Sequence, residues 1–501
     1  MSTQIFLKPK TSWINATKVY LNRRVLAMLF LGFSAGLPLF LIFSTLSLWL
    51  RDAGVDRSAV TYFSWAALAY SFKFVWAPII DKLPLPLLNT LLGRRRSWLL
   101  VAQVAIMLSI ISMAMIDPAY GLSGMAIAVV LLGFSSATQD IVIDAYRIEA
   151  VHEEYQAAMS AMYIAGYRIG MLVSGAGGLY LASFFGVENQ YIYQAWQNTY
   201  LIMAAVMLVG VTTTFLIKEP EINRNVDNYF HRLSDYVRFF LMFLVMVVAF
   251  IYGFSIFNFG LSSGFINEFV RLFLSLCFSL LGIYLLVILN IINKKMVYST
   301  YIEPVVDFFK RYGKATILLL LLVGLYRISD IVLGVIANVF YHDLGFSKNE
   351  IATTTKVFGI IMILIGGFLG GVMTMRYGVM RILLLGAILS ALTNLLFMLL
   401  AQAGNDITML SLVIAADNLS AGLASAAFIA YLSSLTNISF TAVQYAILSS
   451  LMTLLPKLLG GYSGSMVNEI GYSSFFMMTA IMGLPVIILI YYLMFNKQKI
   501  N

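Results

Sequence analysis

The sequence has very little charge and almost no cysteine. Only 11% of its 501 residues are charged, whereas 61% are hydrophobic, and soluble domains usually carry about 25% charged residues. A single cysteine, Cys277, excludes an intramolecular disulfide and any cysteine-based metal cluster. Three histidines (His152, His231 and His342) lie far apart, without the spacing of metal ligands. We therefore expect no metal and no cofactor, and a chain that folds in a non-aqueous solvent.

Long apolar runs dominate what is present. They recur from residue 25 to residue 495, and each is long enough to cross a hydrocarbon core of about 30 Å as a helix. The N-terminus lacks the cleavable pattern of a signal peptide, so we expect the first run to remain an anchor. The sequence predicts an all-α membrane protein with fourteen spans, at residues 25–50, 59–80, 98–116, 122–146, 157–184, 197–217, 236–258, 271–292, 316–341, 351–375, 381–401, 408–431, 440–460 and 472–495.

The basic residues lie in alternate loops between these runs. If the N-terminus is inside, 23 of the 32 Lys and Arg residues fall on the inner side, four fall outside and five fall within spans. The positive-inside rule predicts this asymmetry, so we expect both termini in the cytoplasm. The net charge of +9 then reflects topology and not a nucleic-acid partner. We expect a monomer whose partners are the lipid bilayer and a small solute.

Two charged segments, 218–235 and 293–315, divide the fourteen spans into groups. They bracket one pair of spans and leave six on either side, and each six has a basic loop between its second and third spans. This 6+6 pattern looks like the major facilitator architecture, two six-helix bundles around a central cavity. We expect an N-terminal bundle over residues 1–217, linkers with two additional spans over 218–315, packed on the outside, and a C-terminal bundle over 316–501.

Charged residues also occur inside the expected spans. A charge at bilayer depth costs ~2.5–3.5 kcal/mol on insertion scales, so it is rare unless it faces a cavity or an opposite charge. Nearly equal numbers of bases and acids permit pairing. These residues predict a polar passage for a charged solute, and they are Lys73, Arg168, Arg327, Lys356, Lys457, Asp140, Asp144, Asp330 and Asp417.

The fourth span carries the most suggestive pair. Asp140 and Asp144 are four residues apart and therefore share one helix face. Two carboxylates so placed could take up and release protons, which makes both candidate proton-coupling residues. The alternative is that each is held in an ion pair, with Lys73 or Arg168 as the plausible partner. Both interpretations stay open at the level of sequence.

The second half offers a comparable set. Arg327 and Asp330 are three residues apart and can interact on one face, either as a substrate contact or as a pair that fixes packing. Arg327 and Lys356 are better substrate candidates, because a base in a cavity attracts an anionic ligand. Lys457 is expected to extend its amine to an interface. The candidate substrate-binding residues are Lys73, Gln139, Tyr167, Arg168, Arg327, Asp330, Lys356 and Asp417.

The loop after the second span has two possible interpretations. Arg94, Arg95 and Arg96 together with Asp81 are a topology signal, since consecutive arginines resist translocation. They are also candidate gating residues, a latch that closes the inner side in one carrier state. In the fifth span, Gly166 and Gly170 predict close packing of helix backbones.

Several segments resemble the AmpG muropeptide permease family. They lie along nearly the whole chain, and the family also has fourteen spans with an added pair between the bundles. The stretch QDIVIDA, within the segment SATQDIVIDAYR (136–147), is the most specific. The segments are YSFKFVWAP (70–78) ending at Asp81, GRRRSW (93–98), SATQDIVIDAYR (136–147), GYRIGMLVSG (166–175), YRISD (326–330), ADNLSAGLASAAFIAYL (416–432) and SFTAVQYAILSS (439–450).

The resemblance implies a permease of the bacterial inner membrane that works in peptidoglycan recycling. Such permeases import N-acetylglucosaminyl-1,6-anhydro-N-acetylmuramyl peptides from the periplasm by proton symport, and in many Gram-negative bacteria this flux controls induction of a β-lactamase. The chain departs from several members at Asp417, where they have the longer Glu. Related branches that carry siderophores or acetyl-CoA make a siderophore or acyl-CoA-like anionic solute the alternative. An intramembrane enzyme or a channel is disfavoured by the scattered histidines and by the lack of a re-entrant filter sequence.

Overall fold

The computed structural model is helical throughout, with a single isolated β-bridge. It describes residues 12–55, 63, 68–187, 190–221, 233–257, 264–460 and 462–495. Within these ranges, twelve helices are long and apolar enough to cross a membrane. The all-α membrane class is therefore confirmed.

The predicted total of fourteen spans is not confirmed. Twelve of the predicted spans coincide with the long apolar helices. Much of the span expected at 59–80 lies outside the described residues, and its described part is broken into α5 (Leu68–Phe72), a 3₁₀ turn (Lys73–Val75) and α6 (Ala77–Lys82). Pro78 is the second residue of α6, in the first turn, where its missing N–H breaks no hydrogen bond within the helix. The span expected at 271–292 corresponds to the C-terminal part of α15 (Gly264–Ile288), of which Phe273–Ile288 is a shorter apolar helix.

The first half contains long helices interrupted by short breaks. The first span bends after Pro38, where α2 gives way to α3, and the fifth contains a π-helical segment at Val173–Gly177. Its helices are α1 (Trp13–Lys18), α2 (Arg23–Ile42), α3 (Ser44–Asp52), α5, α6, α7 (Leu88–Leu92), α8 (Arg94–Ala114), α9 (Leu122–Ala150), α10 (Gln156–Leu172), α11 (Gly178–Phe185), α12 (Tyr193–Val206) and α13 (Leu208–Leu216).

The second half follows a connecting region with two long helices. That region holds α14 (Leu233–Ile256), α15, α16 (Lys294–Val297) and α17 (Glu303–Tyr312). The second half holds α18 (Thr316–Leu325), α19 (Ile328–Asp343), α20 (Lys348–Ile351), α21 (Gly359–Tyr377), α22 (Val379–Ala403), α23 (Ile407–Leu435), α24 (Thr441–Gly460), α25 (Ser463–Met482) and α26 (Leu484–Phe495).

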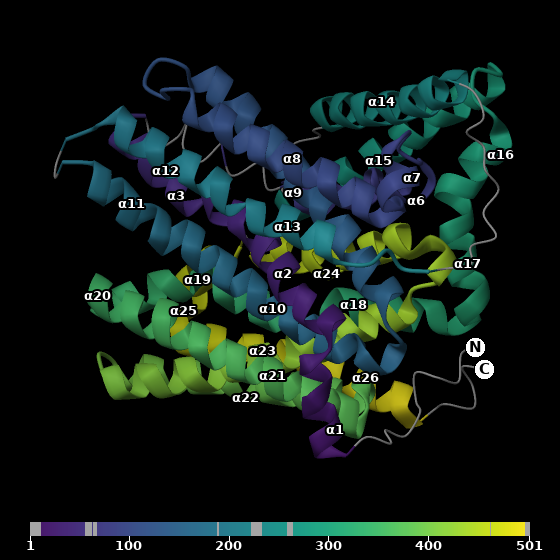
Figure 1. Cartoon of the computed structure of the whole chain (residues 1–501). Coiled ribbons are helices and arrows are strands. Elements are labelled where there is room, and N and C mark those ends of the chain that lie inside the picture. The colour runs from purple at the N-terminus through teal and green to yellow at the C-terminus, as the bar shows by residue number, and fades with distance from the viewer. Residues whose placement is uncertain are drawn as a thin grey trace.

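The two halves meet along several helices near the middle of the molecule. From the first half, α10 packs against α21 and α23, and α9 and α6 pack against α24. Figure 1 shows α10, α21, α23 and α24 in the interior, between the outer helices α11 and α12 of one half and α22 of the other. A passage between the halves would therefore be bordered by α9, α10, α23 and α24.

The helices α14 and α15 lie beside the bundle, at its edge in Figure 1. They pair with each other and bury Phe239, Met242 and Ile283 against Val75 and Ile79 of the second span. Phe72 and Phe250 extend this contact with ring centroids 5.1 Å apart. This is the peripheral position expected for the additional pair.

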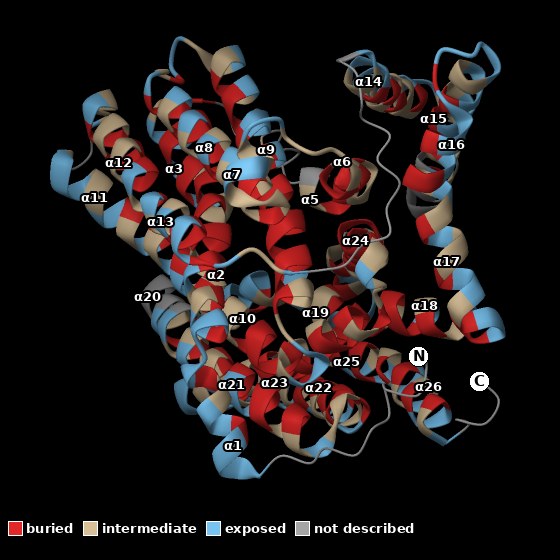
Figure 2. Ribbon diagram, turned by 45° about the vertical axis from the view of Figure 1, so that its right-hand side comes forward, coloured by how far each residue is buried: buried red, intermediate tan, exposed pale blue. Residues whose placement is uncertain are grey.

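Large apolar side chains remain exposed over the outside of the bundle. Figure 2 shows exposed residues along α11 and α12, whereas buried residues concentrate on the inner helices. Phe184 is 79% exposed and Leu216 is also 79% exposed. Soluble proteins rarely expose contiguous apolar surface on this scale, so this surface suits lipid.

Glycines bring α2 and α10 into backbone contact. A Cβ added at Gly166 would lie 1.8 Å from the carbonyl oxygen of Leu29, and one at Gly170 would lie 2.2 Å from that of Phe33. Gly32 and Gly36 meet the α10 backbone in the same way from the other side. Only glycine fits where two helix backbones approach this closely, so the predicted close packing is confirmed.

Gly166→Ala is therefore expected to destabilise the first half. The new methyl group would collide with backbone and not with a flexible side chain, so we expect a cost of about 3 kcal/mol or more, at the upper end for overpacking. Gly334→Ala in α19 is the matched control, because a Cβ there would meet no atom within 4 Å. Thermal unfolding in detergent should show a large fall for Gly166→Ala and no fall for Gly334→Ala.

Candidate functional site

The interior charges of the first half are organised around α9. Asp140, Asp144 and Arg147 follow one another at helical spacing and lie on one face. Lys73 reaches them from the 3₁₀ turn of the second span, which is attached to α9 by two hydrogen bonds. The Tyr70 hydroxyl donates to Ser136 at 2.6 Å, and the Trp76 indole N–H donates to Thr138 at 3.1 Å.

Asp144 is held between two bases. Its Oδ2 lies 3.2 Å from Lys73 Nζ, and its Oδ1 lies 3.3 Å from a terminal nitrogen of Arg147. All three side chains are buried. The sequence left two interpretations of Asp144 open, proton coupling or an ion pair. The structure shows an ion pair with Lys73 and a second one with Arg147.

Asp140 is held differently although it lies one turn away. It is 7% exposed and accepts a hydrogen bond from the Tyr163 hydroxyl at 3.4 Å. Lys73 is within electrostatic range, as is Asp144. In the described part of the chain, however, no base lies within ion-pair distance of Asp140. It is a buried carboxylate with one neutral donor.

The second half repeats this contrast. Arg327 Nε lies 3.1 Å from Asp330 Oδ2, and Arg327 also donates to the Ser425 hydroxyl at 2.8 Å. Asp330 additionally accepts from Ser390. Asp417 receives only a hydrogen bond from Thr393 at 3.4 Å, with no base at ion-pair distance among the described side chains. Among the described side chains, each half thus has one interior carboxylate in an ion pair and one without.

One arginine from each half lies near the interface between the halves. Arg168 of α10 lies within electrostatic range of Arg327, so the two like charges repel each other. Among the described atoms, Arg168 makes only a weak polar contact, from its guanidinium to the sulfur of Met171 at 4.0 Å. A half-buried guanidinium without a carboxylate, opposite a second arginine, makes this part of the interface electropositive.

The other predicted contacts divide between core and surface. Gln139 is fully buried and donates to the Ser34 carbonyl at 3.1 Å, so it ties α9 to α2. Tyr167 is half-buried and packs on Tyr163 with centroids 5.9 Å apart, beside Arg168. Lys457 is exposed, as expected for a side chain that reaches an interface. The side chain of Lys356 lies outside the described part of the structure.

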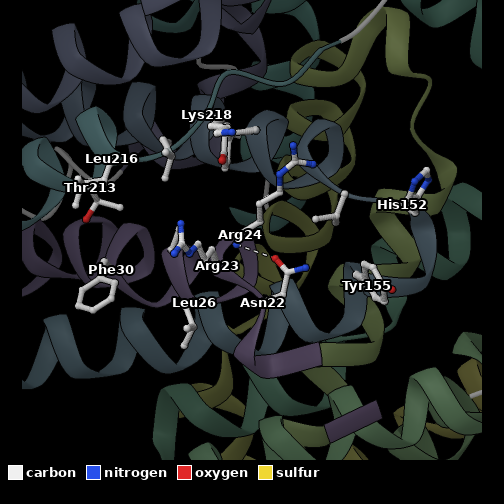
Figure 3. Close-up of a pocket in the computed structure, with 14 residues that line it drawn as sticks. Asn22, Arg23, Arg24, Leu26, Phe30, His152, Tyr155, Thr213, Leu216 and Lys218 are labelled. Atoms are coloured by element: carbon white, nitrogen blue, oxygen red, sulfur yellow. Dashed lines mark hydrogen bonds between the residues drawn. The ribbon is translucent and has the colours of Figure 1, made fainter. Parts of the chain in front are cut away.

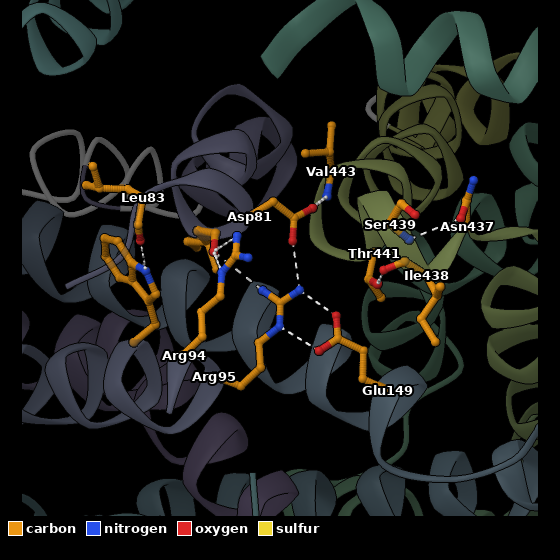
Figure 4. Close-up of polar contacts among 12 residues, drawn as sticks. Asp81, Leu83, Arg94, Arg95, Glu149, Asn437, Ile438, Ser439, Thr441 and Val443 are labelled. Carbon is orange, nitrogen blue, oxygen red and sulfur yellow. Dashed lines mark hydrogen bonds and ion pairs between the residues drawn. The ribbon is translucent and has the colours of Figure 1, made fainter. Parts of the chain in front are cut away.

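A second polar network lies at one end of the bundle (Figure 4). Arg95 is 1% exposed and bonds Asp81 at 2.7 Å and Glu149 at 2.5 and 2.9 Å. The other oxygen of Asp81 accepts the backbone N–H of Val443 at 2.9 Å, which belongs to the second half. We call the end of the bundle that carries these residues the basic face.

The three consecutive arginines at the basic face make different contacts. Arg95 holds the two carboxylates, Arg94 donates to the Ile80 carbonyl at 3.4 Å, and Arg96 donates to the carbonyls of Thr214 and Phe215, both at 3.0 Å. Glu219 caps the same helix, because its carboxylate accepts the backbone N–H groups of Arg95 at 2.7 Å and Arg96 at 3.0 Å. An acid at this position also favours the positive end of the helix dipole.

Further contacts join the halves at the basic face. Arg147 is fully buried and donates to Ser433 at 2.7 Å, and its guanidinium lies 5.0 Å from the Tyr445 ring centroid. The amine of Lys82 lies 5.4 Å from the Phe440 centroid. The Tyr20 hydroxyl donates to the Phe368 carbonyl at 3.3 Å. These contacts draw the two halves together at that end.

The connecting segment is fastened to the same place. Arg311 of α17 donates to Gln444 at 2.8 Å and to the Leu435 carbonyl at 3.1 Å. Gln444 in turn donates to Asp307 and to the Pro304 carbonyl, both at 2.8 Å. Because Gln444 follows Val443, the linker and Asp81 attach to adjacent residues of α24.

Sequence reasoning missed four of these residues. Arg147 falls one residue beyond the span expected at 122–146, although its spacing of three from Asp144 is a signal for an ion pair. Glu149 lies on the same helix and could have been noticed as an acid near the arginine loop. Glu219 and Val443 could not, since they meet their partners across more than a hundred residues.

This fold and this arrangement of interior charges are those of a membrane carrier, and comparison defines its class. The family model of the Major Facilitator Superfamily matches residues 28–325 and 319–500. The structure resembles the proton:xylose symporter XylE, with a TM-score of 0.60 at 12% identity over 96% of both chains. It resembles the fucose:proton symporter FucP of E. coli equally, with a TM-score of 0.60 at 10% identity over 93% of this chain and 97% of the other.

Sequence relatives narrow the class. The chain is 32% identical to "Putative transporter AmpG 4" of Rickettsia conorii over 485 residues, 97% of this chain and 99% of the relative. It is 28% identical to the "Anhydromuropeptide permease" of Escherichia coli K12, over 94% of this chain and 80% of the relative. The chain belongs to the AmpG family of the major facilitator superfamily, which is a family of transporters and not of enzymes. The resemblance expected from the sequence motifs is confirmed.

Proposed function

We propose that this protein imports anhydromuropeptides, GlcNAc-1,6-anhydroMurNAc peptides, from the periplasm into the cytoplasm by proton symport and alternating access. The observation that carries the proposal is one interior carboxylate in each half, the buried Asp140 and the half-buried Asp417, with no base at ion-pair distance among the described side chains. Arg168 and Arg327, whose like charges repel each other, come from opposite halves. The relative in E. coli is named for the same substrate class. We further propose that the protein works as a monomer in the inner membrane.

The arginine pair supports an anionic substrate. Two like charges in repulsion are stabilised when an anion lies between them, and Arg168 and Arg327 come from opposite halves. A peptide carboxylate that bridges them would hold the halves in one arrangement and release them on leaving. Charge-assisted hydrogen bonds of this kind contribute about 1.5–3 kcal/mol each.

The basic face supports a gate and an orientation. By the positive-inside rule, the end that carries Arg94, Arg95 and Arg96 faces the cytoplasm, which puts both termini there. In this proposal the Asp81–Val443 and Arg147–Ser433 contacts form the gate that closes the cytoplasmic side. Substrate entry would be followed by release of these contacts.

Uptake into sealed membrane vesicles tests the proposal. Labelled anhydromuropeptide should accumulate when a proton gradient is imposed, and a protonophore should abolish the accumulation. Vesicles without the protein measure leakage. Absence of protonophore-sensitive uptake by a well-inserted protein would refute proton-coupled import. Uptake of an iron-loaded siderophore or an acyl-CoA in its place would assign a different anionic solute to the same carrier.

Arg168→Gln is expected to raise the KM for uptake by roughly 10-fold or more, since one charge-assisted contact with the substrate is lost. Because Arg168 has no carboxylate within ion-pair distance among the described residues, thermal stability should change little. Lys457→Gln removes an exposed base from α24 and is the control, with an unchanged KM expected. A normal KM for Arg168→Gln would remove Arg168 from the substrate site.

A further inference from the structure

A cavity of about 830 Å³ opens at the basic face, next to the Thr214 and Phe215 carbonyls that Arg96 bonds. It lies between the N-terminal end of α2, the segment that follows α9, and the C-terminal end of α13. All its lining residues fall between Asn22 and Lys218, within the first half. It is therefore not part of the interface between the halves, and a substrate that crosses between them would not pass through it.

Basic side chains border this cavity (Figure 3). Arg23, Arg24 and Lys218 contribute three positive charges, and His152 lies at the far side. Arg24 donates to the Ala150 carbonyl, which fixes its guanidinium at the rim. Within the described ranges, neither Arg23 nor Lys218 has a carboxylate at ion-pair distance. The neighbouring acid Glu219 accepts from the backbone of α8.

Apolar side chains form the wall beside these charges. Leu26 and Phe30 of α2 are 37% and 48% exposed, and Leu216 of α13 is 79% exposed. All three line the cavity and continue along helices whose outer surface faces the membrane. Positive charge at the membrane face and an apolar wall that leads into the membrane are therefore joined in one site.

We infer that this cavity binds the head group of an anionic phospholipid from the adjacent leaflet. The phosphate would lie against Arg23, Arg24 and Lys218, and the acyl chains would extend along Leu26, Phe30 and Leu216. Basic pockets between membrane helices attract anionic head groups through the negative charge of the lipid surface. A free phosphate could use the basic rim but not the apolar wall. None of the residues assigned to transport lines this cavity.

Native mass spectrometry of the detergent-purified wild-type protein gives the first test. Phosphatidylglycerol and phosphatidylcholine of identical chains are titrated separately, with sn-glycerol 3-phosphate as a head group without chains. We expect phosphatidylglycerol to bind at least 10-fold more tightly than either. Equal binding of the two lipids would overturn the inference, and binding of glycerol phosphate as tight as that of phosphatidylglycerol would assign the site to a soluble anion.

A double variant locates the binding. Arg23→Gln with Lys218→Gln removes two rim charges and leaves Arg24, whose contact with Ala150 supports the fold. Phosphatidylglycerol affinity should fall on the order of 10-fold, since a basic residue near a charged lipid surface contributes appreciably to attraction. Lys310→Gln with Lys314→Gln removes the same charge from exposed positions at and after α17, and affinity should stay within twofold. Equal losses in both variants, or no loss in the first, would overturn the assignment.

Discussion

Asp140→Asn should abolish protonophore-sensitive accumulation of anhydromuropeptide while the protein still inserts and folds. The substitution removes a titratable group and almost no volume, and it breaks no ion pair, because Asp140 receives only the Tyr163 hydroxyl among described residues. One proton moved across about 100 mV supplies about 2.3 kcal/mol, which corresponds to roughly 50-fold accumulation. The variant should lose this factor and match wild-type vesicles treated with protonophore.

Glu469→Gln is the matched control for this prediction. Glu469 is an exposed carboxylate of α25, so its neutralisation should leave accumulation unchanged. Thermal unfolding of Asp140→Asn in detergent should be close to that of the wild type, which separates lost coupling from lost structure. If Asp140→Asn accumulates substrate normally, Asp140 does not couple, and Asp417→Asn becomes the decisive variant because Asp417 is the other interior carboxylate without a base at ion-pair distance among the described side chains.

Arg95→Ala should be the most destabilising substitution at the basic face. Asp81 and Glu149 share this guanidinium, and Arg95 and Glu149 are each about 2% exposed in their side chains. Removing one member of a buried ion pair typically costs 3–5 kcal/mol, because the opposite charge stays desolvated. We expect a marked drop in the thermal unfolding midpoint in detergent, and little uptake, since the Asp81 contact to Val443 depends on the same network.

The adjacent arginine provides an internal comparison. Arg96 bonds the carbonyls of Thr214 and Phe215 and is only partly buried, so Arg96→Ala should cost about 1–1.5 kcal/mol. Neutralising the two acids as well, with Asp81→Asn and Glu149→Gln in the Arg95→Ala background, should recover part of the stability. Similar midpoints for Arg95→Ala and Arg96→Ala would contradict the assigned difference between these neighbours.

Sequence alone predicts the long helices of this fold because lipid imposes a strong and local constraint. A run of about 20 apolar residues must form a helix to satisfy its backbone in the membrane, whatever the rest of the chain does. Prediction from hydrophobicity is weaker where tertiary contacts interrupt a span. The second span is interrupted at Lys73–Val75, and the flanking residues Tyr70 and Trp76 form hydrogen bonds with α9. The periodicity of its own residues does not predict this interruption.

The sequence predicted which charged residues lie in the interior better than it predicted which of them form ion pairs. Arg327 and Asp330 could be matched because their spacing on a helix brings them together. The contrast between Asp140 and Asp144 could not, since it depends on which of two carboxylates, one turn apart, Lys73 reaches from another helix. In the same way Gln139 looked like a ligand contact from its neighbours, yet it is buried against Ser34 of α2. Partners on different helices are set by packing, which a single sequence does not display.

The glycine contacts between α2 and α10 limit how this carrier changes state. Gly32 and Gly36 meet the α10 backbone, and Gly166 and Gly170 meet the α2 backbone, so no side chain separates the two helices at these points and they cannot slide past each other by exchanging rotamers. Gly366, Gly370 and Gly422 lock α21 to α23 in the same manner. Sliding between these two helix pairs is therefore blocked, and the alternating access that we propose would take place as a rigid-body tilt of one bundle against the other about their shared seam.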